Sequence, residues 1–331
     1  MARGKILGID IGSSTIKLAL VKNGYLVRCA TVDMPRGLMQ QDSRLSSTNE
    51  IAELLTKAMR DNGIRARRAA IVVSNEVSYL RELTLPRMTV GQLEKNLPYE
   101  FRNYIDGDPM SYYYDYEMLS EVRPEDEEMQ LMAVAFPKEV FEEMWDFIPR
   151  AGLKLVRIAP TESALQGLIR QSANLGSLKR EYCFLNLGHN ATRMFMFKGD
   201  RHMATRILET GLSSLETAIS DGMNVDRRTA HDYLLTNYAD CQTQEFSMEI
   251  YRAVAVELMR ALNFYMFSNP DSDLKDLWIG GGGCAIPPLL DTINETLEIT
   301  VHTADDLIRT TGPIEGAYNY LQAVGITMDW R

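Results

Sequence analysis

The sequence predicts an α/β protein made of two related halves, and three observations lead to this fold class. Residues 5–20 alternate apolar and β-branched residues on either side of a Gly-Ser-Ser turn, the pattern of two strands joined by a hairpin. Residues 182–197 show the same pattern 176 residues later, when Asn186 is matched to Asp10. A repeat of this length indicates two structurally related units. Four consecutive glycines, residues 280–283, follow a further strand and precede a helix.

The composition excludes several classes of protein. The 331 residues carry a formal net charge of −10, which disfavours nucleic acid as a partner because Lys and Arg are needed to neutralise phosphates. No segment approaches the run of about 18 apolar residues that a spanning helix needs, so we expect no membrane span. The four cysteines lie far apart and form no C-x-x-C pair, so buried free thiols in a reducing cytoplasm are expected.

In the first half, a third antiparallel strand at 24–32 follows an Asn-Gly turn, and a helix beginning near residue 50 places its apolar residues on one face. Strands follow at 69–73 and 77–85, and Pro86 ends the second of them. Between residues 87 and 150 the order helix, strand, strand, helix predicts an inserted α/β subdomain. Its tyrosine-rich strand at 112–119 is better explained by packing against helices than by a partner surface.

The second half continues with a strand at 155–160, a helix at 162–172 and the repeated hairpin, whose third strand is 202–208. Helices are predicted at 211–222, 227–236 and 247–267, the last with apolar residues at helical spacing. A strand at 274–279 leads directly into the glycines. A short strand at 298–301 and a helix at 314–324 complete the predicted elements.

The opening hairpin carries residues suited to phosphate and metal chemistry. A turn of this kind directs backbone N–H groups into one concavity, which can bind an anion. Asp10 precedes the turn, where a carboxylate can hold a hydrated divalent cation, and Lys17 follows it, where an ammonium can reach a phosphate oxygen. Taken alone the pattern fits an ordinary hairpin equally well, and its recurrence favours the phosphate site.

The glycine run at 280–283 has two interpretations. Successive glycines cost chain entropy, which is accepted where backbone passes close to a ligand or to another chain segment. A tight turn needs only one or two glycines, so approach to a ligand is the favoured interpretation.

Three ordered segments carry a family resemblance. They are Ile9-Asp10-Ile11-Gly12-Ser13-Ser14-Thr15-Ile16-Lys17, Leu185-Asn186-Leu187-Gly188-His189-Asn190-Ala191-Thr192 and Gly280-Gly281-Gly282-Gly283. These segments resemble the two phosphate motifs and the adenosine motif of the ATPase superfamily of actin, heat-shock chaperones and sugar kinases. Within it the chain resembles the PilM family, the cytoplasmic actin-like proteins of type IV pilus assembly. The resemblance covers nearly the whole chain.

The resemblance implies an α/β actin-like ATPase fold, with two RNase-H-like lobes around a nucleotide cleft and an α/β subdomain inserted in lobe I, as in FtsA. It assigns residues 1–86 and 151–180 to the core of lobe I and residues 87–150 to the inserted subdomain. Residues 181–331 are assigned to lobe II, with a helical subdomain at about 212–270.

The same resemblance implies ATP or ADP with Mg²⁺ as the bound ligand. Phosphate contacts carry over to Gly12, Ser13, Ser14 and Lys17 on one side and to Gly188, His189 and Asn190 on the other. Adenosine contacts carry over to Gly281, Gly282 and Gly283. Asp10 is expected to orient Mg²⁺ through water, with Asn186 as a weaker metal contact, and Asp10 and Glu162 are the candidate catalytic groups.

The chain departs from the family pattern where hydrolysis would be affected. The second motif usually begins with aspartate, and the amide of Asn186 supplies no negative charge to the water shell of a cation. His189 and Asn190 replace small residues of that turn, and Arg228 and His231 stand where the family tends to carry Glu and Lys near the adenosine. We therefore expect nucleotide binding with weak or absent hydrolysis.

The resemblance implies a cytoplasmic ATP-binding scaffold of a type IV pilus or related secretion machine. Such a protein docks the short cytoplasmic tail of an inner-membrane PilN-like protein in a groove between lobe I and the inserted subdomain, which brings it to the inner membrane. A secretion ATPase and a platform protein are further candidate partners. Two alternatives stay open: a small-molecule kinase of the same superfamily, and a filament-forming FtsA-like protein.

Overall fold

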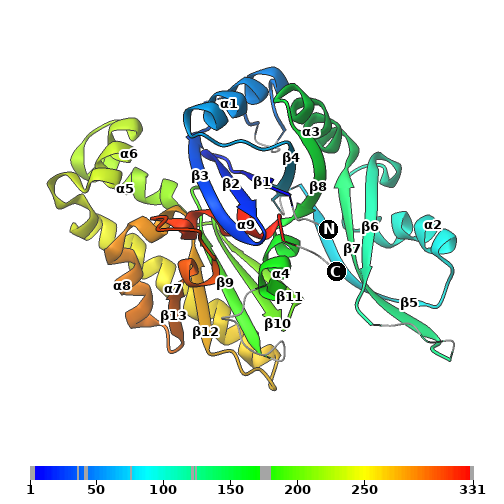
Figure 1. Cartoon of the computed structure of the whole chain (residues 1–331). Helices are drawn as coiled ribbons and strands as arrows, with labels where there is room; N and C mark the ends of the chain where they lie inside the picture. The colour runs from blue at the N-terminus through cyan, green and yellow to red at the C-terminus, as the bar shows by residue number, and fades with distance from the viewer. Residues whose placement is uncertain are drawn as a thin grey trace. The chain divides into compact units, whose positions relative to one another are not determined.

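Two five-stranded sheets with the same strand order organise the chain (Figure 1). The computed structural model describes residues 4–35, 37–40, 44–74, 77–120, 123, 125–171 and 180–328. Packing divides the chain into two units, one of residues 1–23 and 28–164 and the other of residues 24–27 and 165–331.

The first sheet combines an antiparallel hairpin with parallel strands. Its order is β3 (Tyr25–Asp33), β2 (Thr15–Lys22), β1 (Ile6–Ile11), β4 (Arg68–Val73) and β8 (Lys154–Pro160). Strand β1 pairs antiparallel with β2 and parallel with β4, and β4 pairs parallel with β8. The central strands are buried on both faces, which is why their sequences read as nearly continuous apolar runs.

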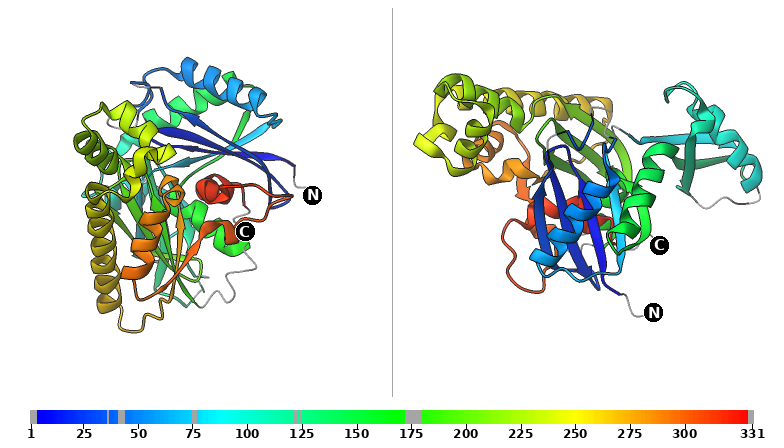
Figure 2. Two further views of the ribbon diagram at one scale, coloured as in Figure 1. Left: turned by 90° about the vertical axis from the view of Figure 1, so that its left-hand side faces the viewer. Right: turned by 90° about the horizontal axis from the view of Figure 1, so that it is seen from above.

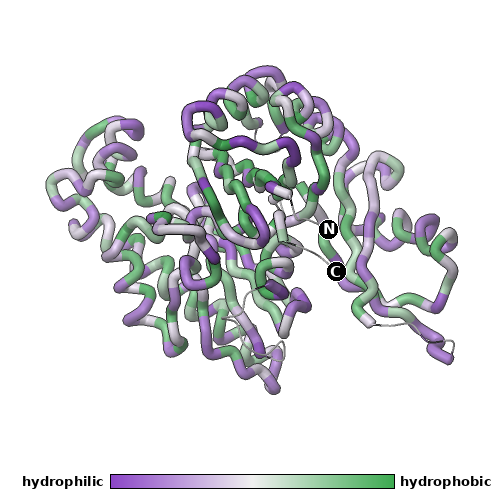
Figure 3. Tube along the Cα trace, in the orientation of Figure 1, coloured by the Kyte–Doolittle hydropathy of each residue, from purple (hydrophilic) through white to green (hydrophobic). Residues whose placement is uncertain are grey.

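Helices α1 (Thr48–Asp61) and α3 (Lys138–Arg150) lie together over one face of this sheet (Figure 2). Helix α1 begins at Ser47, whose side chain accepts a hydrogen bond from the backbone N–H of Glu50. Both helices bury an apolar stripe in the same core as β1 and β4, including Leu55 of α1 and Phe147 of α3. In Figure 3 their outward turns are largely hydrophilic, as expected for amphipathic helices.

A three-stranded antiparallel sheet forms a separate small core in the first unit. Its order is β5 (Tyr79–Pro86), β7 (Glu128–Pro137) and β6 (Tyr112–Met118), and α2 (Val90–Phe101) covers one of its faces. The predicted insert of 87–150 differs from this packing unit at both ends. Strand β5 pairs along its whole length with β7, whereas α3 packs in the core of the five-stranded sheet. The alternating pattern of 79–86 predicts a strand but not which strand it pairs with.

The second sheet repeats the order of the first. It contains β11 (Arg201–Leu208), β10 (Thr192–Lys198), β9 (Glu181–Leu187), β12 (Asp276–Gly280) and β13 (Thr300–Thr303). Four helices pack in one hydrophobic core with this sheet: α5 (Leu212–Met223), α6 (Arg227–Thr236), α7 (Glu245–Ser268) and α8 (Pro287–Thr296). Strands β9, β12 and β13 run parallel, as β1, β4 and β8 do.

Two further helices, α4 (Thr161–Gln171) and α9 (Leu321–Gly325), are shorter. The predicted helix at 314–324 begins later than expected, with a 3-10 turn at Ala317–Tyr320 before α9. Gly316 adopts a left-handed φ of 70°, which a continuing right-handed helix does not allow. In the part of the chain that the structure describes, no helix has both the length and the hydrophobicity needed to cross a membrane.

We expect His202 on β11 to make the stability of the second unit pH-dependent. Burial lowers the pKa of His202 to about 4, and its ring packs edge-on against Phe197. The unfolded chain takes up this proton at about pH 6.5 and the folded chain only near 4, so stability falls as the pH drops through this window, by up to about 3 kcal/mol.

Urea unfolding between pH 4 and 7 checks this expectation. His202→Gln should flatten the pH dependence relative to the unchanged chain. An equal pH dependence in His202→Gln and the unchanged chain would contradict the assignment.

Candidate functional site

The first turn, residues 12–14, is closed by its own backbone. Gly12 N–H donates to the carbonyl of Thr15 at 2.9 Å, and a Cβ at Gly12 would lie 3.0 Å from that oxygen. Met34 N–H donates to the carbonyl of Ser14 at 2.8 Å, which anchors the turn to the segment after β3. A larger residue at the first position of the turn would therefore meet a tight contact with the backbone.

Asp10 and Lys17 lie directly opposite each other beside this turn. They are paired in the β1–β2 register, so both side chains lie on the same face of the sheet. Directly opposed residues have Cβ atoms about 4.5–5.5 Å apart. The hairpin thus places the two residues as cross-strand neighbours on one face of the sheet.

These groups lie at the carboxyl edge of the parallel strands. Asp10 is in register with Val72 of β4, and Val72 is in register with Ala159 of β8. Glu162 follows β8 in the first turn of α4 and is buried. Open α/β sheets bind ligands beyond the carboxyl ends of their strands, so both candidate catalytic residues of the first unit occupy the expected edge.

The second turn, residues 188–191, joins strands paired in the same register as those of the first turn, although its backbone closes differently, because Gly188 N–H donates to the carbonyl of Asn186 at 3.0 Å. Leu187 pairs with Thr192 as Ile11 pairs with Ile16, so the offset of 176 residues holds on both strands. A Cβ at Gly188 would lie 2.7 Å from the carbonyl oxygen of Ala191, which repeats the constraint found at the first turn.

Arg193 is a candidate phosphate ligand that the sequence interpretation missed. It is paired with Asn186 as Lys17 is with Asp10. Its Nη1 atom lies 3.9 Å from the Cβ position of Gly188, so the guanidinium lies near the turn. Adding the same offset to Lys17 would have found it.

Helix α5 holds the second turn from the other side. The N–H groups of Leu212 and Ser213 donate to the carbonyls of Gly188 and His189 at 3.0 and 2.8 Å. Gly211 precedes the helix, and a Cβ there would lie 2.4 Å from the carbonyl oxygen of His189. The first N–H groups of α5 are thus bonded to the turn, and they fix its position.

A buried carboxylate lies beside the second turn. Glu216 of α5 is only 7% exposed, and its Oε1 lies 3.5 Å from Nδ1 of His189 and 2.7 Å from Nδ1 of His231 on α6. The three side chains, called the Glu216 cluster below, are distant in sequence, and no local pattern points to Glu216. Sequence reasoning singled out both histidines but not the carboxylate that joins them.

The glycine run lies at the same edge of the second sheet as the second turn. Gly280 is in register with Asn186. A Cβ at Gly281 would lie 2.4 Å from Oδ1 of Asn186, and one at Gly283 would lie 2.6 Å from Cβ of Leu187. Contacts with the protein's own atoms therefore explain these glycines, while Gly282 is partly exposed and is the member of the run best placed for a ligand.

The side chain of Asn186 has an unusual environment. Its Oδ1 is buried and has no hydrogen-bond partner in the described part of the chain. Buried polar atoms are nearly always paired, so an atom of this kind is suited to a ligand or a bound water. The residues present therefore fit a polar ligand at this edge.

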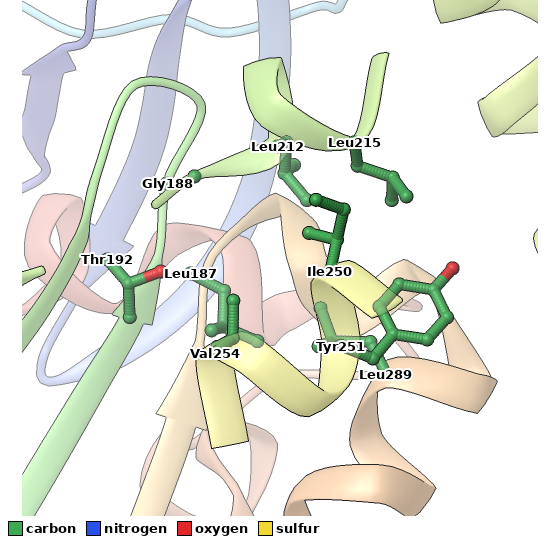
Figure 4. A pocket seen from close by; sticks show the side chains of 10 residues that line it. Leu187, Gly188, Thr192, Leu212, Leu215, Ile250, Tyr251, Val254 and Leu289 are labelled. Atoms are coloured by element: carbon green, nitrogen blue, oxygen red, sulfur yellow. The ribbon is translucent and has the colours of Figure 1, made fainter. Parts of the chain in front are cut away.

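A small cavity lies beneath the second turn (Figure 4). Its lining includes Gly188, Thr192, Leu212 and Ile250. The volume of about 10 Å³ is enough for one water at most, so a larger ligand has to bind outside it. Among the described residues there is no group of three or more His, Cys, Asp or Glu side chains able to hold a metal ion.

Comparison with family models decides the family. Residues 8–311 match the family described as type IV pilus assembly protein PilM. The chain belongs to this family. This match confirms the resemblance noted in the sequence, while a comparison with curated proteins finds no match.

Solved structures show the fold. A PilM-PilN type IV pilus biogenesis complex is 22% identical, with a TM-score of 0.82 and 98% of each chain covered. The ethanolamine utilization protein EutJ from Carboxydothermus hydrogenoformans is 15% identical, with a TM-score of 0.59 and 99% of this chain and 90% of that chain covered. An archaeal actin homologue is 12% identical, with a TM-score of 0.51 and 98% of each chain covered. The predicted actin-like ATPase fold is confirmed.

Gly211→Ala should displace the second turn from α5. The added Cβ meets backbone atoms that cannot rotate away, and overpacking of this kind costs about 1–3 kcal/mol. Urea unfolding of the purified protein should show the loss.

Gly91→Ala in α2 is the matched control for this substitution. Nothing lies within 4 Å of its Cβ position, and alanine is the better helix former, so we expect no loss of stability. Equal stabilities of the two variants would contradict the close packing at Gly211.

Proposed function

We propose that the protein is a nucleotide-binding scaffold of a type IV pilus or related secretion machine, with ATP or ADP and Mg²⁺ as its ligand. Membership of the PilM family supports the pathway. The observation that carries the nucleotide assignment is the repeated turn, which occurs at the carboxyl edge of both sheets with a basic residue at the same register position.

In the first unit, Gly12, Ser13 and Ser14 would hold phosphate oxygens through the turn, with Lys17 as the neighbouring cation. Asp10 would hold Mg²⁺ through water, because Mg²⁺ in nucleotide sites is usually bound by one or two carboxylates together with the phosphates. The Asp10–Lys17 register places both groups beside the turn. When bound, Mg²⁺ would supply charge neutralisation to the phosphates.

In the second unit, Gly188, His189 and Asn190 would contact phosphate, assisted by Arg193. Gly281, Gly282 and Gly283 would lie near the adenosine, with Gly282 the most accessible of the three. The buried Oδ1 of Asn186 is suited to accept a hydrogen bond from the hydration shell of the cation. An amide does this without adding negative charge.

Weak or absent hydrolysis is part of the proposal. Where the family pattern has a second carboxylate, Asn186 leaves one fewer negative charge to hold Mg²⁺ and to orient an attacking water. Glu162 is the remaining candidate base, and it is buried in the first turn of α4. A nucleotide held in this way would act as a structural ligand.

Calorimetric titration with Mg²⁺–ATP, together with a phosphate-release assay, tests this function. We expect saturable binding and slow turnover, and Asp10→Ala should weaken binding at least about tenfold, equivalent to 1.4 kcal/mol. Asp115→Ala, on an exposed position of β6, is the control. Absence of binding would refute the proposal, and rapid turnover that depends on a small substrate would favour a kinase.

We further propose that the chain docks the cytoplasmic tail of an inner-membrane PilN-like protein. The similar solved structure is a PilM-PilN complex, which supports a partner of this kind. Docking would place the protein at the cytoplasmic side of the inner membrane through its partner. A secretion ATPase or platform protein is a further proposed partner.

The surface that we propose for docking is an aromatic strip formed by Tyr113, Phe141 and Trp145. The rings of Tyr113 and Phe141 are 5.0 Å apart, and those of Phe141 and Trp145 are stacked at 5.8 Å. Trp145 is 59% exposed. Aromatic residues of this kind are common anchors of interfaces because they bury a large area at low entropic cost.

The strip continues onto the face of the small sheet opposite α2. Leu80 of β5 and Val134 of β7 are directly opposed on this face and partly exposed. Helix α3 is fixed beside it, because Glu143 accepts a hydrogen bond from the N–H of Leu45 and pairs with Arg44 at 3.3 Å. An apolar surface beside a helix that is held in this way suits a short peptide.

Trp145→Ala should weaken peptide binding about thirtyfold, because an interface tryptophan contributes about 2 kcal/mol or more. Fluorescence anisotropy with a labelled peptide of the PilN-like tail measures the change. Phe264→Ala on α7, also an exposed aromatic at 56%, is the matched control and should bind normally. Unchanged affinity in Trp145→Ala would place the groove elsewhere.

A further inference from the structure

We propose that phosphate binding at the second turn is coupled to the uptake of a proton by His189, with buried Glu216 as its counter-ion. The inference rests on the proposed nucleotide function and adds how that site is regulated. It arises from the Glu216 cluster, which brings a carboxylate and two imidazoles together at one side of the turn.

The geometry makes His189 the residue that senses phosphate. It belongs to the turn itself, and its backbone carbonyl is held by the N–H of Ser213 at 2.8 Å. Its Nδ1 faces Oε1 of Glu216 at 3.5 Å, and its side chain is 26% exposed. The ring therefore has one nitrogen directed to a buried carboxylate, while part of its surface stays accessible to solvent or ligand.

With neutral histidines the cluster carries the single negative charge of Glu216. A phosphate brought to the turn then meets a carboxylate that is shielded from solvent, and like charges repel most where water is excluded. A proton taken from solvent by His189 turns the pair into an imidazolium and a carboxylate. Both ring nitrogens then carry N–H groups, so His189 can donate to Glu216 and to a phosphate oxygen together.

Other charged groups near the turn and the cluster include His231 of α6 and Arg193 of β10. His231 already forms the shorter bond to Glu216, at 2.7 Å, and lies on a helix outside the turn. Arg193 lies near Gly188 and remains positive at all working pH values, so it does not titrate. The phosphate's own negative charge favours the protonated form of the nearest imidazole, which is that of His189.

The number of histidines makes the assignment testable. The chain contains four, and burial lowers the pKa of His202 to about 4, which removes it from titration near neutral pH. His302 lies on β13. Its Nε2 is hydrogen-bonded to Oδ1 of Asp276 on β12 at 2.8 Å, and its ring stacks on Trp278. It is therefore a matched control, a half-buried histidine beside a carboxylate that is not part of the cluster.

The test is calorimetric titration of the full chain with Mg²⁺–ATP at pH 7.5 in two buffers of different ionisation enthalpy, PIPES and Tris. This pH lies above the second pKa of a phosphate group, about 6, so the nucleotide itself takes up little proton. We expect net proton uptake on nucleotide binding, and an affinity that falls with rising pH toward the limit of about tenfold per unit for one linked proton.

Single substitutions then assign the proton. His189→Gln should abolish the uptake and flatten the pH dependence of affinity, whereas His302→Gln should leave both unchanged. His231→Gln should retain most of the uptake. Glu216→Gln should reduce the proton uptake. Because Glu216 is buried and its substitution can disturb the fold, His189→Gln, which alters a more accessible side chain, is the deciding variant.

Two results would overturn the inference alone: nucleotide binding by the unchanged chain without proton uptake, and undiminished uptake in His189→Gln. Absence of nucleotide binding in the unchanged chain would overturn both the inference and the proposed function. The two failures are therefore distinguishable in one set of titrations.

Discussion

Close packing of glycine backbone at the carboxyl edge of the second sheet is the constraint on which the site depends. Gly211 meets the carbonyl of His189, Gly281 meets the amide of Asn186, and Gly283 meets the side chain of Leu187. A side chain at any of these positions would overlap neighbouring atoms. The strand end, the turn and the start of α5 are thereby held in one arrangement, with hydrogen bonds from Leu212 and Ser213 fixing the turn.

The two units share the same hairpin register, but the residues at equivalent positions carry different charges. Asp10 and Lys17 pair a carboxylate with an ammonium, whereas Asn186 and Arg193 pair an amide with a guanidinium at the same register positions. In the proposed site the first pair would combine a cation ligand with a phosphate ligand. The second pair lacks a carboxylate and so would contribute no negative charge to a bound cation. The asymmetry between two otherwise equivalent hairpins is the physical basis for proposing a nucleotide that is bound more readily than it is hydrolysed.

In the first unit, helix α3 connects the small three-stranded sheet to the core of the five-stranded sheet. Helix α3 directly follows β7, buries Phe147 and Ile148 in the core of the five-stranded sheet, and presents Phe141 to Tyr113 of β6. The aromatic strip is consequently made by residues of the small sheet and of α3, both in the first unit, and its geometry depends on how α3 is held by Glu143 and the segment around Leu45. The proposed docking surface therefore does not belong to a single sheet.

Much of this could be predicted because the signals are local. Alternation around Gly12 and Gly188 predicts two hairpins, and a two-residue side-chain period fixes which residues oppose each other, so Asp10 and Lys17 could be placed from sequence. Other features could not. The sequence of β5 predicts a strand but not that its partner is β7. Glu216 contacts His189 and His231 only because α5 and α6 pack beside the turn. Local periodicity thus determined the hairpins, and three ordered motifs carried the family resemblance. The partners of β5 and Glu216 depended on long-range packing that no nearby residue encodes.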